Sequence, residues 1–259
     1  MYNIGFLGGG RMASAIADGL LESPPPLSLA VSAPSLIGGS WGNRKAKVLS
    51  PEELFSSCEW LVLSVKPQIF MKEQANWSNL PFKGKGVISV MAGVKSETIE
   101  KVFPGLPVIR TMPNTPMMFK EGMVALAKGS IATSEHLSEV EAFFSPVAKT
   151  LCVEEKQLDG VTAISGSGPA YIFRMAEEVS DKSADLGLDP KEAIALWAQT
   201  LRGAAAMLEG DTSPKVLREQ VTSPKGTTQA ALDMLEKMGM ANALGAGFQA
   251  AFDRSLELG

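Results

Sequence analysis

The chain has 259 residues, of which 45% are hydrophobic and 20% are charged, a composition typical of folded globular proteins. Its 24 Lys and Arg against 28 Asp and Glu give a formal net charge of -4, which excludes the basic footprint of a nucleic-acid binder and does not favour membrane-surface binding. At this length we expect two domains, each with its own core. The central apolar run at residues 60–63 is too short to span a bilayer, and no signal sequence opens the chain, so a cytoplasmic location is expected.

Cysteine and histidine are scarce, which narrows the possible chemistry. Cys58 and Cys152 form no metal-binding spacing, so no metal site is expected, and both are interpreted as buried small side chains. The only histidine, His136, lies in a polar stretch typical of a capped helix start, which predicts an exposed position. Because histidine is the usual base in alcohol oxidation and serine hydrolysis, its scarcity argues against Ser-His-Asp catalysis and metal-assisted hydrolysis.

Short strand-like runs alternate with helical patterns in the N-terminal part. We expect strands at residues 2–7, 27–32, 60–65, 86–91 and 108–110, with edge strands at 122–127 and 150–153 around the helix that contains His136. Strands that alternate with helices indicate βαβ units with right-handed crossovers. The predicted fold class is therefore α/β, with an N-terminal Rossmann-type, doubly wound, mostly parallel sheet over residues 1–154.

From about residue 155 the strand signal ends and helical patterns continue to residue 259. Asp189 before Pro190 and Ser213 before Pro214 are typical helix starts. The small-residue run at 203–206 would allow two helices to approach closely. These features predict a C-terminal all-α domain over residues 155–259, which either forms a bundle alone or buries a face against another subunit.

Residues 8–13, Gly-Gly-Gly-Arg-Met-Ala, fit the pattern G-x-G-x-x-A at the first strand-to-helix turn. The first glycine permits the tight turn, the second lets the backbone approach a pyrophosphate, and the small third residue lets the helix pack on the strand. A glycine-rich turn without a ligand shows the same letters, but its place in the first βαβ unit favours dinucleotide binding. The predicted cofactor-binding residues of this turn are Gly8, Gly9, Gly10, Arg11 and Met12.

The second strand is expected to end at Ser32 without the Asp or Glu that usually binds the ribose hydroxyls in NAD-selective sites. Because no carboxylate would repel a 2′-phosphate, NADP(H) is the preferred cofactor, and NAD(H) stays possible. Ser32 and Ser35 are predicted to contact it. Arg44 and Lys45 are either further ligands of the 2′-phosphate or solvated loop charges.

Other tracts follow strand ends, at the edge where ligands of open α/β sheets bind. Each tract alone is ordinary loop chemistry, and a proline after a strand can be simple punctuation. Two prolines in the tract at 110–116 would stiffen the loop and direct Asn114 toward the crevice. The cofactor-binding residues predicted from these tracts are Val65, Lys66, Pro67, Met91, Ala92, Gly93 and Asn114.

Two tracts of the C-terminal half carry further signals. Residues 165–171 place small residues before Pro169, which predicts a helix kink or a close helix contact. Residues 223–228, Ser-Pro-Lys-Gly-Thr-Thr, precede a new helix, where backbone N–H groups and hydroxyls can gather around a carboxylate. Alternatively, Thr227 or Thr228 serves only as the N-cap of that helix.

Together these motifs resemble pyrroline-5-carboxylate reductase over essentially the whole chain, above all in residues 214–236. The resemblance implies an oxidoreductase that transfers hydride from NAD(P)H to 1-pyrroline-5-carboxylate and forms L-proline, the last step of proline biosynthesis. It also implies a helical domain that interlocks with a second subunit, giving a homodimer and in many cases a ring of dimers. The predicted catalytic residues are Thr228 and Ser223, and the predicted substrate-binding residues are Ser223, Gly226, Thr227 and Thr228.

The sequence departs from this family at two places and leaves other readings open. Lys225 stands where the family usually has a small residue, and Ala33 and Pro34 stand where it often has Arg or Asn. Glu155 matches a position where the family often has an acidic residue near the active site. A β-hydroxyacid dehydrogenase would need a lysine in the cleft, with Lys182 and Lys191 as candidates in polar stretches. Another imine reductase on the same fold, or a nucleotide-sensing protein that would not need residues 223–228, are the remaining alternatives.

Overall fold

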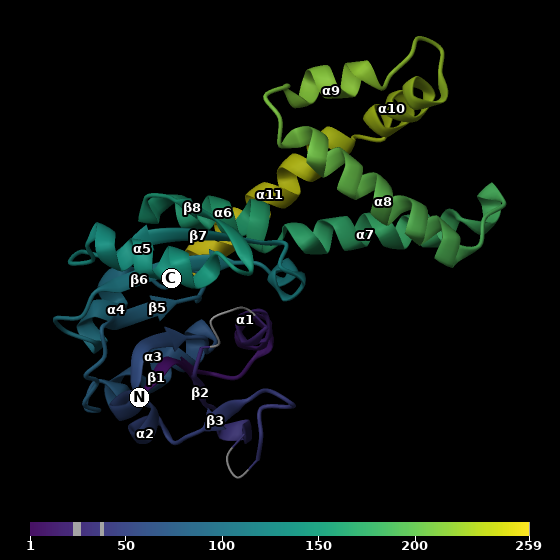
Figure 1. Ribbon diagram of the computed structural model, residues 1–259. Coiled ribbons are helices and arrows are strands. Elements are labelled where there is room, and N and C mark those ends of the chain that lie inside the picture. The colour runs from purple at the N-terminus through teal and green to yellow at the C-terminus, as the bar shows by residue number, and fades with distance from the viewer. Residues whose placement is uncertain (23–26, 37–38, 259) are drawn as a thin grey trace. The chain divides into compact units, whose positions relative to one another are not determined.

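The computed structural model describes residues 1–22, 27–36 and 39–258. The chain divides into two compact units, one formed by Met1–Pro169 with Ala250–Gly259 and the other by Ala170–Gln249. The first unit is an α/β domain and the second is entirely helical in its regular elements (Figure 1). The α/β class and the helical C-terminal part that we predict are both confirmed.

The first unit is built on one sheet of eight strands in the order β3-β2-β1-β4-β5-β6-β7-β8. All neighbouring strands are parallel except β6 and β7. The strands are β1 (Tyr2–Leu7), β2 (Leu29–Ser32), β3 (Ala46–Val48), β4 (Cys58–Leu63), β5 (Gly86–Ser89), β6 (Val108–Pro113), β7 (Gly122–Lys128) and β8 (Ala148–Cys152). The helices are α1 (Arg11–Leu21), α2 (Pro51–Ser57), α3 (Pro67–Trp77), α4 (Ser96–Val102), α5 (Ser134–Phe144) and α6 (Leu158–Val161).

Several predicted strands shift by a few residues, and one strand is new. β4 begins at Cys58 and ends at Leu63, because the following residues already lead into α3. β7 is not an edge strand, since β8 pairs with it and covers its outer side. β3 was not predicted, because a strand of three residues is too short to show an alternating pattern.

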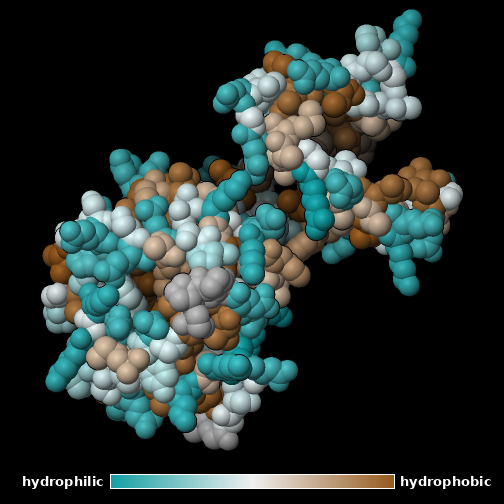
Figure 2. All heavy atoms as spheres, viewed as in Figure 1, coloured by the Kyte–Doolittle hydropathy of each residue, from teal (hydrophilic) through white to brown (hydrophobic). Residues whose placement is uncertain are grey.

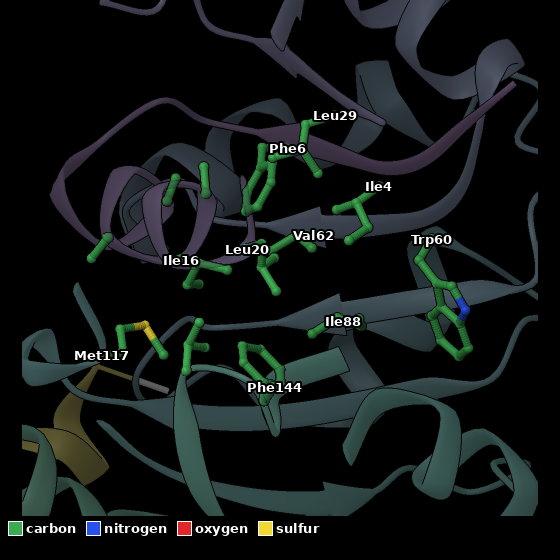
Figure 3. Packing of buried hydrophobic residues seen from close by; sticks show 14 of the residues in the cluster. Ile4, Phe6, Ile16, Leu20, Leu29, Trp60, Val62, Ile88, Met117 and Phe144 are labelled. Atoms are coloured by element: carbon green, nitrogen blue, oxygen red, sulfur yellow. The ribbon is translucent and has the colours of Figure 1, made fainter. Parts of the chain in front are cut away.

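Alternating side chains of the strands fill two separate hydrophobic layers. In β4, Trp60 and Val62 join the layer that contains α1 and α5, whereas Leu61 and Leu63 join the layer that contains α2, α3 and α4. Figure 3 shows part of the first layer, where Ile16 and Leu20 of α1 lie close to strand residues such as Val62. Burial on both faces explains why these strands are nearly continuous hydrophobic runs. The sheet is doubly wound, as predicted.

The second unit consists of helices that bury very little of their own apolar surface. α7 (Gly168–Lys182) leads into it, α8 (Pro190–Leu208), α9 (Pro214–Gln220) and α10 (Thr227–Lys237) follow, and α11 (Met240–Glu257) ends the chain's regular structure. No residue of α7, α9 or α10 is buried, and all residues of these helices are described. Figure 2 shows hydrophobic side chains at the surface of these helices. Two of the exposed hydrophobic residues are Phe173 of α7, at 63% exposure, and Met234 of α10, at 55%. Among the described helices, none is both long enough and apolar enough to cross a membrane.

Candidate functional site

The strand order of the sheet reverses direction between β1 and β4. From β1 the chain moves outward to β2 and β3, then returns to place β4 on the other side of β1. Ligands of open α/β sheets bind in the crevice at such a switch point, outside the carboxyl ends of the strands. The glycine turn follows β1, and Ser64 follows β4, so the structure brings these two predicted tracts together.

Hydrogen bonds lock the glycine turn onto the neighbouring strands. The backbone N–H of Gly8 donates to the carbonyl of Ser32 at 2.8 Å, and the N–H of Ser64 donates to the carbonyl of Leu7 at 2.9 Å. The Ser64 hydroxyl also donates to the carbonyl of Gly8 at 2.9 Å. These contacts hold the turn close to β4, and they leave no room for a side chain on the inner side of Gly8.

Gly8 and Gly10 are required for different physical reasons. Gly8 has φ +110°, and a Cβ there would lie 2.6 Å from the carbonyl oxygen of Ser64, so only glycine fits without strain. Gly10 is the N-cap of α1 in an extended conformation, and a Cβ there would meet nothing within 4 Å. No side chain caps α1 among the described residues, so the start of the helix has no side-chain acceptor. Ala13 is fully buried and lets α1 pack on the sheet. The turn therefore fits a pyrophosphate at a helix N-terminus.

Trp41 packs against the glycine turn and was not among the predicted site residues. Its indole N–H donates to the carbonyl of Gly9 at 3.3 Å, and its buried ring meets the edge of Phe6 at 5.4 Å between centroids. Trp41 occupies the long connection between β2 and β3, whose described residues include no α-helix. A single large aromatic residue in a glycine-rich loop was the available signal.

In Rossmann-type folds, the residues after the second strand usually contact the ribose of the cofactor. Ser32 is buried and its carbonyl belongs to the glycine turn, whereas Ser35 is exposed in a short 3-10 turn. Arg44 is not a solvated loop charge: its Nε and Nη2 lie 2.6 Å from the two carboxylate oxygens of Asp18, and its guanidinium stacks 5.2 Å from the Trp41 ring. Lys45 is exposed. No Asp or Glu occurs between residues 33 and 45, so the connection carries no carboxylate to repel a 2′-phosphate.

The tracts after β4 and β5 lie along the same edge of the sheet. Lys66 is exposed and is the N-cap residue of α3, with Pro67 as the first helical residue. Its carbonyl accepts from Ile69 and Phe70 at 2.9 and 3.1 Å. After β5, Met91 is buried, Ala92 is half-buried and Gly93 adopts a φ of 77°. Most predicted cofactor contacts lie at this carboxyl edge of the sheet: Gly8, Gly9, Gly10, Arg11, Met12, Ser32, Ser35, Val65, Lys66, Pro67, Met91, Ala92 and Gly93.

Asn114 occupies a different environment from the open crevice that we predict. It is only 9% exposed, and its Oδ1 accepts a hydrogen bond from the backbone N–H of Met123 at 2.9 Å. Its Nδ2 lies 3.3 Å from both the carbonyl oxygen and the hydroxyl of Ser165. Its side chain thus connects β7 with the segment that precedes α7.

Glu155 lies in a dense network next to this edge. Its carboxylate accepts hydrogen bonds from the Ser96 backbone N–H and hydroxyl, both at 2.6 Å, and from Arg110 at 3.0 Å. Burial acts to raise the pKa of Glu155, but the hydrogen bonds from Ser96 and the ion pair with Arg110 outweigh it and hold that pKa below its ordinary value. Because Arg110 is only 3% exposed, Glu155 also neutralises a buried cation. Glu155 therefore ties the end of β8 to β6 and to the start of α4.

The predicted substrate loop lies in the second unit and forms a type II turn. The backbone N–H of Gly226 donates to the carbonyl of Ser223 at 3.0 Å, and Lys225 has φ 60° at the third position of that turn. A Cβ on Gly226 would overlap the Ser223 hydroxyl, which brings that hydroxyl close to the helix start. Ser223 and Thr227 are exposed, and Thr228 is half-buried.

The start of α10 is not capped by a threonine. The N-cap is Gly226, and Thr227 and Thr228 are the first two residues of the helix. No described side chain caps this helix. The alternative in which one of these threonines serves only as the N-cap is therefore wrong. The N–H groups of the first turn therefore have no capping side chain, and the N–H of Gly226 itself is used in the turn.

The remaining titratable candidates lie outside these two regions. Cys58 is buried as predicted, and burial raises the pKa of its thiol to about 12. Cys152 is exposed, contrary to the prediction, because it ends the edge strand β8. His136 is half-buried rather than exposed, since its ring packs against Trp60 with 6.3 Å between centroids. Within the described residues, no three His, Cys, Asp or Glu side chains are grouped as for a metal ion.

The two lysines considered for a dehydrogenase lie at the surface. Lys182 is paired with Asp185 at 3.1 Å, and both side chains are 69% exposed. Lys191 is exposed in the first turn of α8. Both side chains are therefore exposed to solvent, whereas the dehydrogenase alternative would need a lysine enclosed in the cleft.

Comparison with known proteins shows the relationship of the whole chain. It is 37% identical over 265 residues to the pyrroline-5-carboxylate reductase of Synechocystis sp.. The matched region covers 99% of this chain and 98% of that protein. The chain belongs to the pyrroline-5-carboxylate reductase family. The Arabidopsis thaliana member is 36% identical over 266 residues, 99% of this chain and 95% of that protein. The resemblance inferred from the motifs is thereby confirmed.

Family models and solved structures support the same assignment. Residues 155–258 match the model described as pyrroline-5-carboxylate reductase dimerisation, and residues 3–93 match NADP oxidoreductase coenzyme F420-dependent. The crystal structure of Plasmodium falciparum pyrroline carboxylate reductase with NADP bound has a TM-score of 0.90 and 28% identity, and the match covers 100% of this chain and 98% of that one. The reductase from Streptococcus pyogenes gives 0.89 and 28%, with 98% of each chain covered. The doubly wound fold with its helical C-terminal domain is thus shared with these family members.

Proposed function

We propose that this chain reduces 1-pyrroline-5-carboxylate to L-proline with NADPH, the last step of proline biosynthesis. Family membership over the full length supports the activity, and the open, uncapped start of α1 at Gly10 is the structural observation that carries it. NADPH supplies the hydride when bound. The residues of the chain bind the cofactor and hold the imine in one orientation next to it. Catalysis therefore rests on proximity and fixed hydrogen-bond donors.

NADP(H) is the proposed cofactor because the connection after β2 carries no carboxylate. The exposed Ser35 and Lys45 are the groups free to meet a 2′-phosphate, whereas Arg44 is held by Asp18 and Trp41. The NADP-bound relative from Plasmodium falciparum and the NADP oxidoreductase model support this choice. A competition titration in which NADH binds as tightly as NADPH would contradict it.

The proposed substrate site is the loop at the start of α10. The hydroxyl of Ser223 and the backbone N–H groups of Thr227 and Thr228 hold the carboxylate at the positive end of the helix. The Thr228 hydroxyl forms a hydrogen bond with the substrate nitrogen. Gly226 contributes by allowing the close approach of Ser223, since its own N–H is used in the turn.

Replacing Thr228 by alanine tests this site. One lost hydrogen bond to a charged group is worth about 1.5–3 kcal/mol, so kcat/KM should fall by about 10- to 100-fold. Because Thr228 does not cap the helix, the melting temperature and the NADPH affinity should stay near those of the parent. Thr200→Ala is the matched control, since Thr200 is an exposed helical threonine whose hydroxyl bonds only to the carbonyl of Leu196 among the contacts described.

Full imine reduction by Thr228→Ala would refute the role of that hydroxyl. The parent protein should also be assayed with a 3-hydroxyacid and NADP⁺. Turnover of that substrate would favour the β-hydroxyacid dehydrogenase alternative. Reduction of the imine without turnover of the hydroxyacid supports the proposed function.

We also propose a homodimer, with residues 1–154 as the cofactor domain and residues 155–259 as the dimerisation and substrate domain. The dimerisation model at residues 155–258 supports this division. The unburied faces of α7, α9 and α10 support it independently, because helices gain most of their stability from packing an apolar face. A ring of such dimers is the larger assembly that we propose. Light scattering that shows an active monomer at assay concentration would exclude both.

A further inference from the structure

The chain between α6 and α7 contains a backbone irregularity. Residues Thr162–Gly166 form a π-helical turn, η4, in which the N–H of Ser167 donates to the carbonyl of Thr162 at 2.8 Å. π-helical turns inside helices occur frequently at functional sites. In a regular α-helix, the carbonyl of Ser165 would accept from the residue four positions later. That residue is Pro169, which has no N–H.

The Asn114 side chain supplies a donor at that place. Its Nδ2 donates to the Ser165 carbonyl at 3.3 Å, and the same group contacts the Ser165 hydroxyl at 3.3 Å. The orientation of the amide follows from its other end, because Oδ1 must accept from the backbone N–H of Met123 at 2.9 Å. The three residues Asn114, Ser165 and Pro169 belong to the same compact unit.

The segment that Asn114 holds borders residues proposed for the cofactor. A Cβ on Gly166 would lie 3.3 Å from the sulfur of Met112, so η4 rests directly on the end of β6. Met112 packs in one cluster with Ala92, which follows β5 at the carboxyl edge of the sheet. A displacement of η4 would therefore also change the packing of Met112 and of the tract around Ala92.

We infer that Asn114 is a positioning residue that replaces the backbone donor missing at Pro169 and thereby fixes the η4 turn against the cofactor edge of the sheet. The kinetic part of this inference rests on the proposed function. Asn114 acts through Ser165 and Met112 and need not touch the substrate. Its amide is suited to this task because it offers an acceptor to Met123 and a donor to Ser165 at once.

A double-mutant cycle between positions 114 and 169 tests the inference. Asn114→Asp keeps the acceptor for Met123 but turns an acceptor toward the Ser165 carbonyl. Pro169→Ala restores a backbone N–H that can donate to that carbonyl. We expect Asn114→Asp alone to lower kcat by about 10-fold or more at pH 8, and to lower it by less than about 3-fold when Pro169→Ala is present. Asn79→Asp is the matched control, because Asn79 donates to the Ala75 carbonyl at 2.8 Å on the exposed surface.

The pH dependence gives a second readout that a general loss of packing would not produce. The carboxyl introduced by Asn114→Asp is buried, so its pKa is raised, and on protonation its O–H can donate to the Ser165 carbonyl. The kcat of this variant should therefore recover relative to the parent as the pH falls from 8 to 6. Asn79→Asp should follow the parent throughout.

Each outcome decides for or against the bond between Asn114 and Ser165. An equal loss in both backgrounds, or no recovery at low pH, overturns the inference. Should Asn114→Asp alone fail to fold, recovery of folded protein on adding Pro169→Ala supports the inference, and no recovery refutes it. Melting temperatures for the same four proteins repeat the cycle without any assay of activity. If the parent fails to reduce the imine, the proposed function fails, whereas the melting-temperature cycle still tests the bond.

Discussion

Replacing Gly10 by valine should separate cofactor binding from folding. Gly10 has φ -73° and ψ -173°, a conformation open to any residue, and a Cβ there meets nothing within 4 Å. The side chain should therefore be accepted by the fold. It would project into the space in front of α1, where the pyrophosphate is proposed to meet the backbone N–H groups.

The two effects differ greatly in size. Valine is a poorer N-cap than glycine, which costs about 0.5–1 kcal/mol of stability and lowers the melting temperature by about 1–4 °C in a chain of this size. Loss of two hydrogen bonds from the backbone to a charged pyrophosphate costs about 3–6 kcal/mol, since each is worth about 1.5–3 kcal/mol. The dissociation constant for NADPH should then rise by about 100-fold or more.

A fluorescence titration with NADPH and a thermal melt on the same preparation measure both quantities. Gly8→Ala is the control in which stability should change. The φ of +110° at Gly8 and the contact with Ser64 predict a loss of stability of about 2 kcal/mol or more. Parent-like NADPH affinity in Gly10→Val would show that the pyrophosphate does not lie at this turn. A large loss of stability in Gly10→Val would show that the space before α1 is not open.

Two further substitutions probe the strained turn and the buried ion pair. Lys225→Gly should raise the free energy of unfolding by about 0.5–1 kcal/mol, measured by denaturant titration, because the third position of a type II turn requires a positive φ; an unchanged or lower value would contradict the turn assignment. Glu155→Gln should destabilise the protein at neutral pH, because Arg110 loses its partner. The pKa of Glu155 is lowered in the folded state, so its contribution is present above the ordinary carboxyl pKa and is lost as the pH falls through the lowered value. The melting temperatures of parent and Glu155→Gln should therefore converge as the pH falls below the ordinary carboxyl pKa and through the lowered one, and a difference that stays constant throughout the acid range would refute this account.

The parts of the fold that could be predicted are those that leave a local pattern. The strands β1 and β4 are buried on both faces, so they appear as short hydrophobic runs that end at glycine, serine or proline. The glycine turn combines such a run with the start of a helix within a few residues. Both signals depend only on neighbours in the sequence, which is why the sheet class and the residues around Gly8 and Gly10 could be identified.

The parts that could not be predicted depend on contacts between distant residues. Trp41 reaches Gly9 across the connection between β2 and β3, and Asn114 reaches Ser165 from the end of β6. Neither pairing leaves a periodic pattern. The exposure of Cys152 also follows from strand order, since β8 lies at the edge of the sheet, whereas the predicted burial of Cys58 is found because β4 lies inside it.

The helical unit shows a different limit of sequence reasoning. A period of 3.6 residues reveals that a helix has an apolar face, but it does not reveal what covers that face. In this structure large side chains such as Phe173, Leu196 and Met234 remain more than half exposed. Leaving so much apolar surface in water is unfavourable, at about 25 cal/mol for each Å² that a partner could cover. In the proposed homodimer, the stability of these helices should therefore depend on protein concentration, so that folding of the proposed substrate loop at α10 and assembly of the proposed dimer would be parts of one equilibrium.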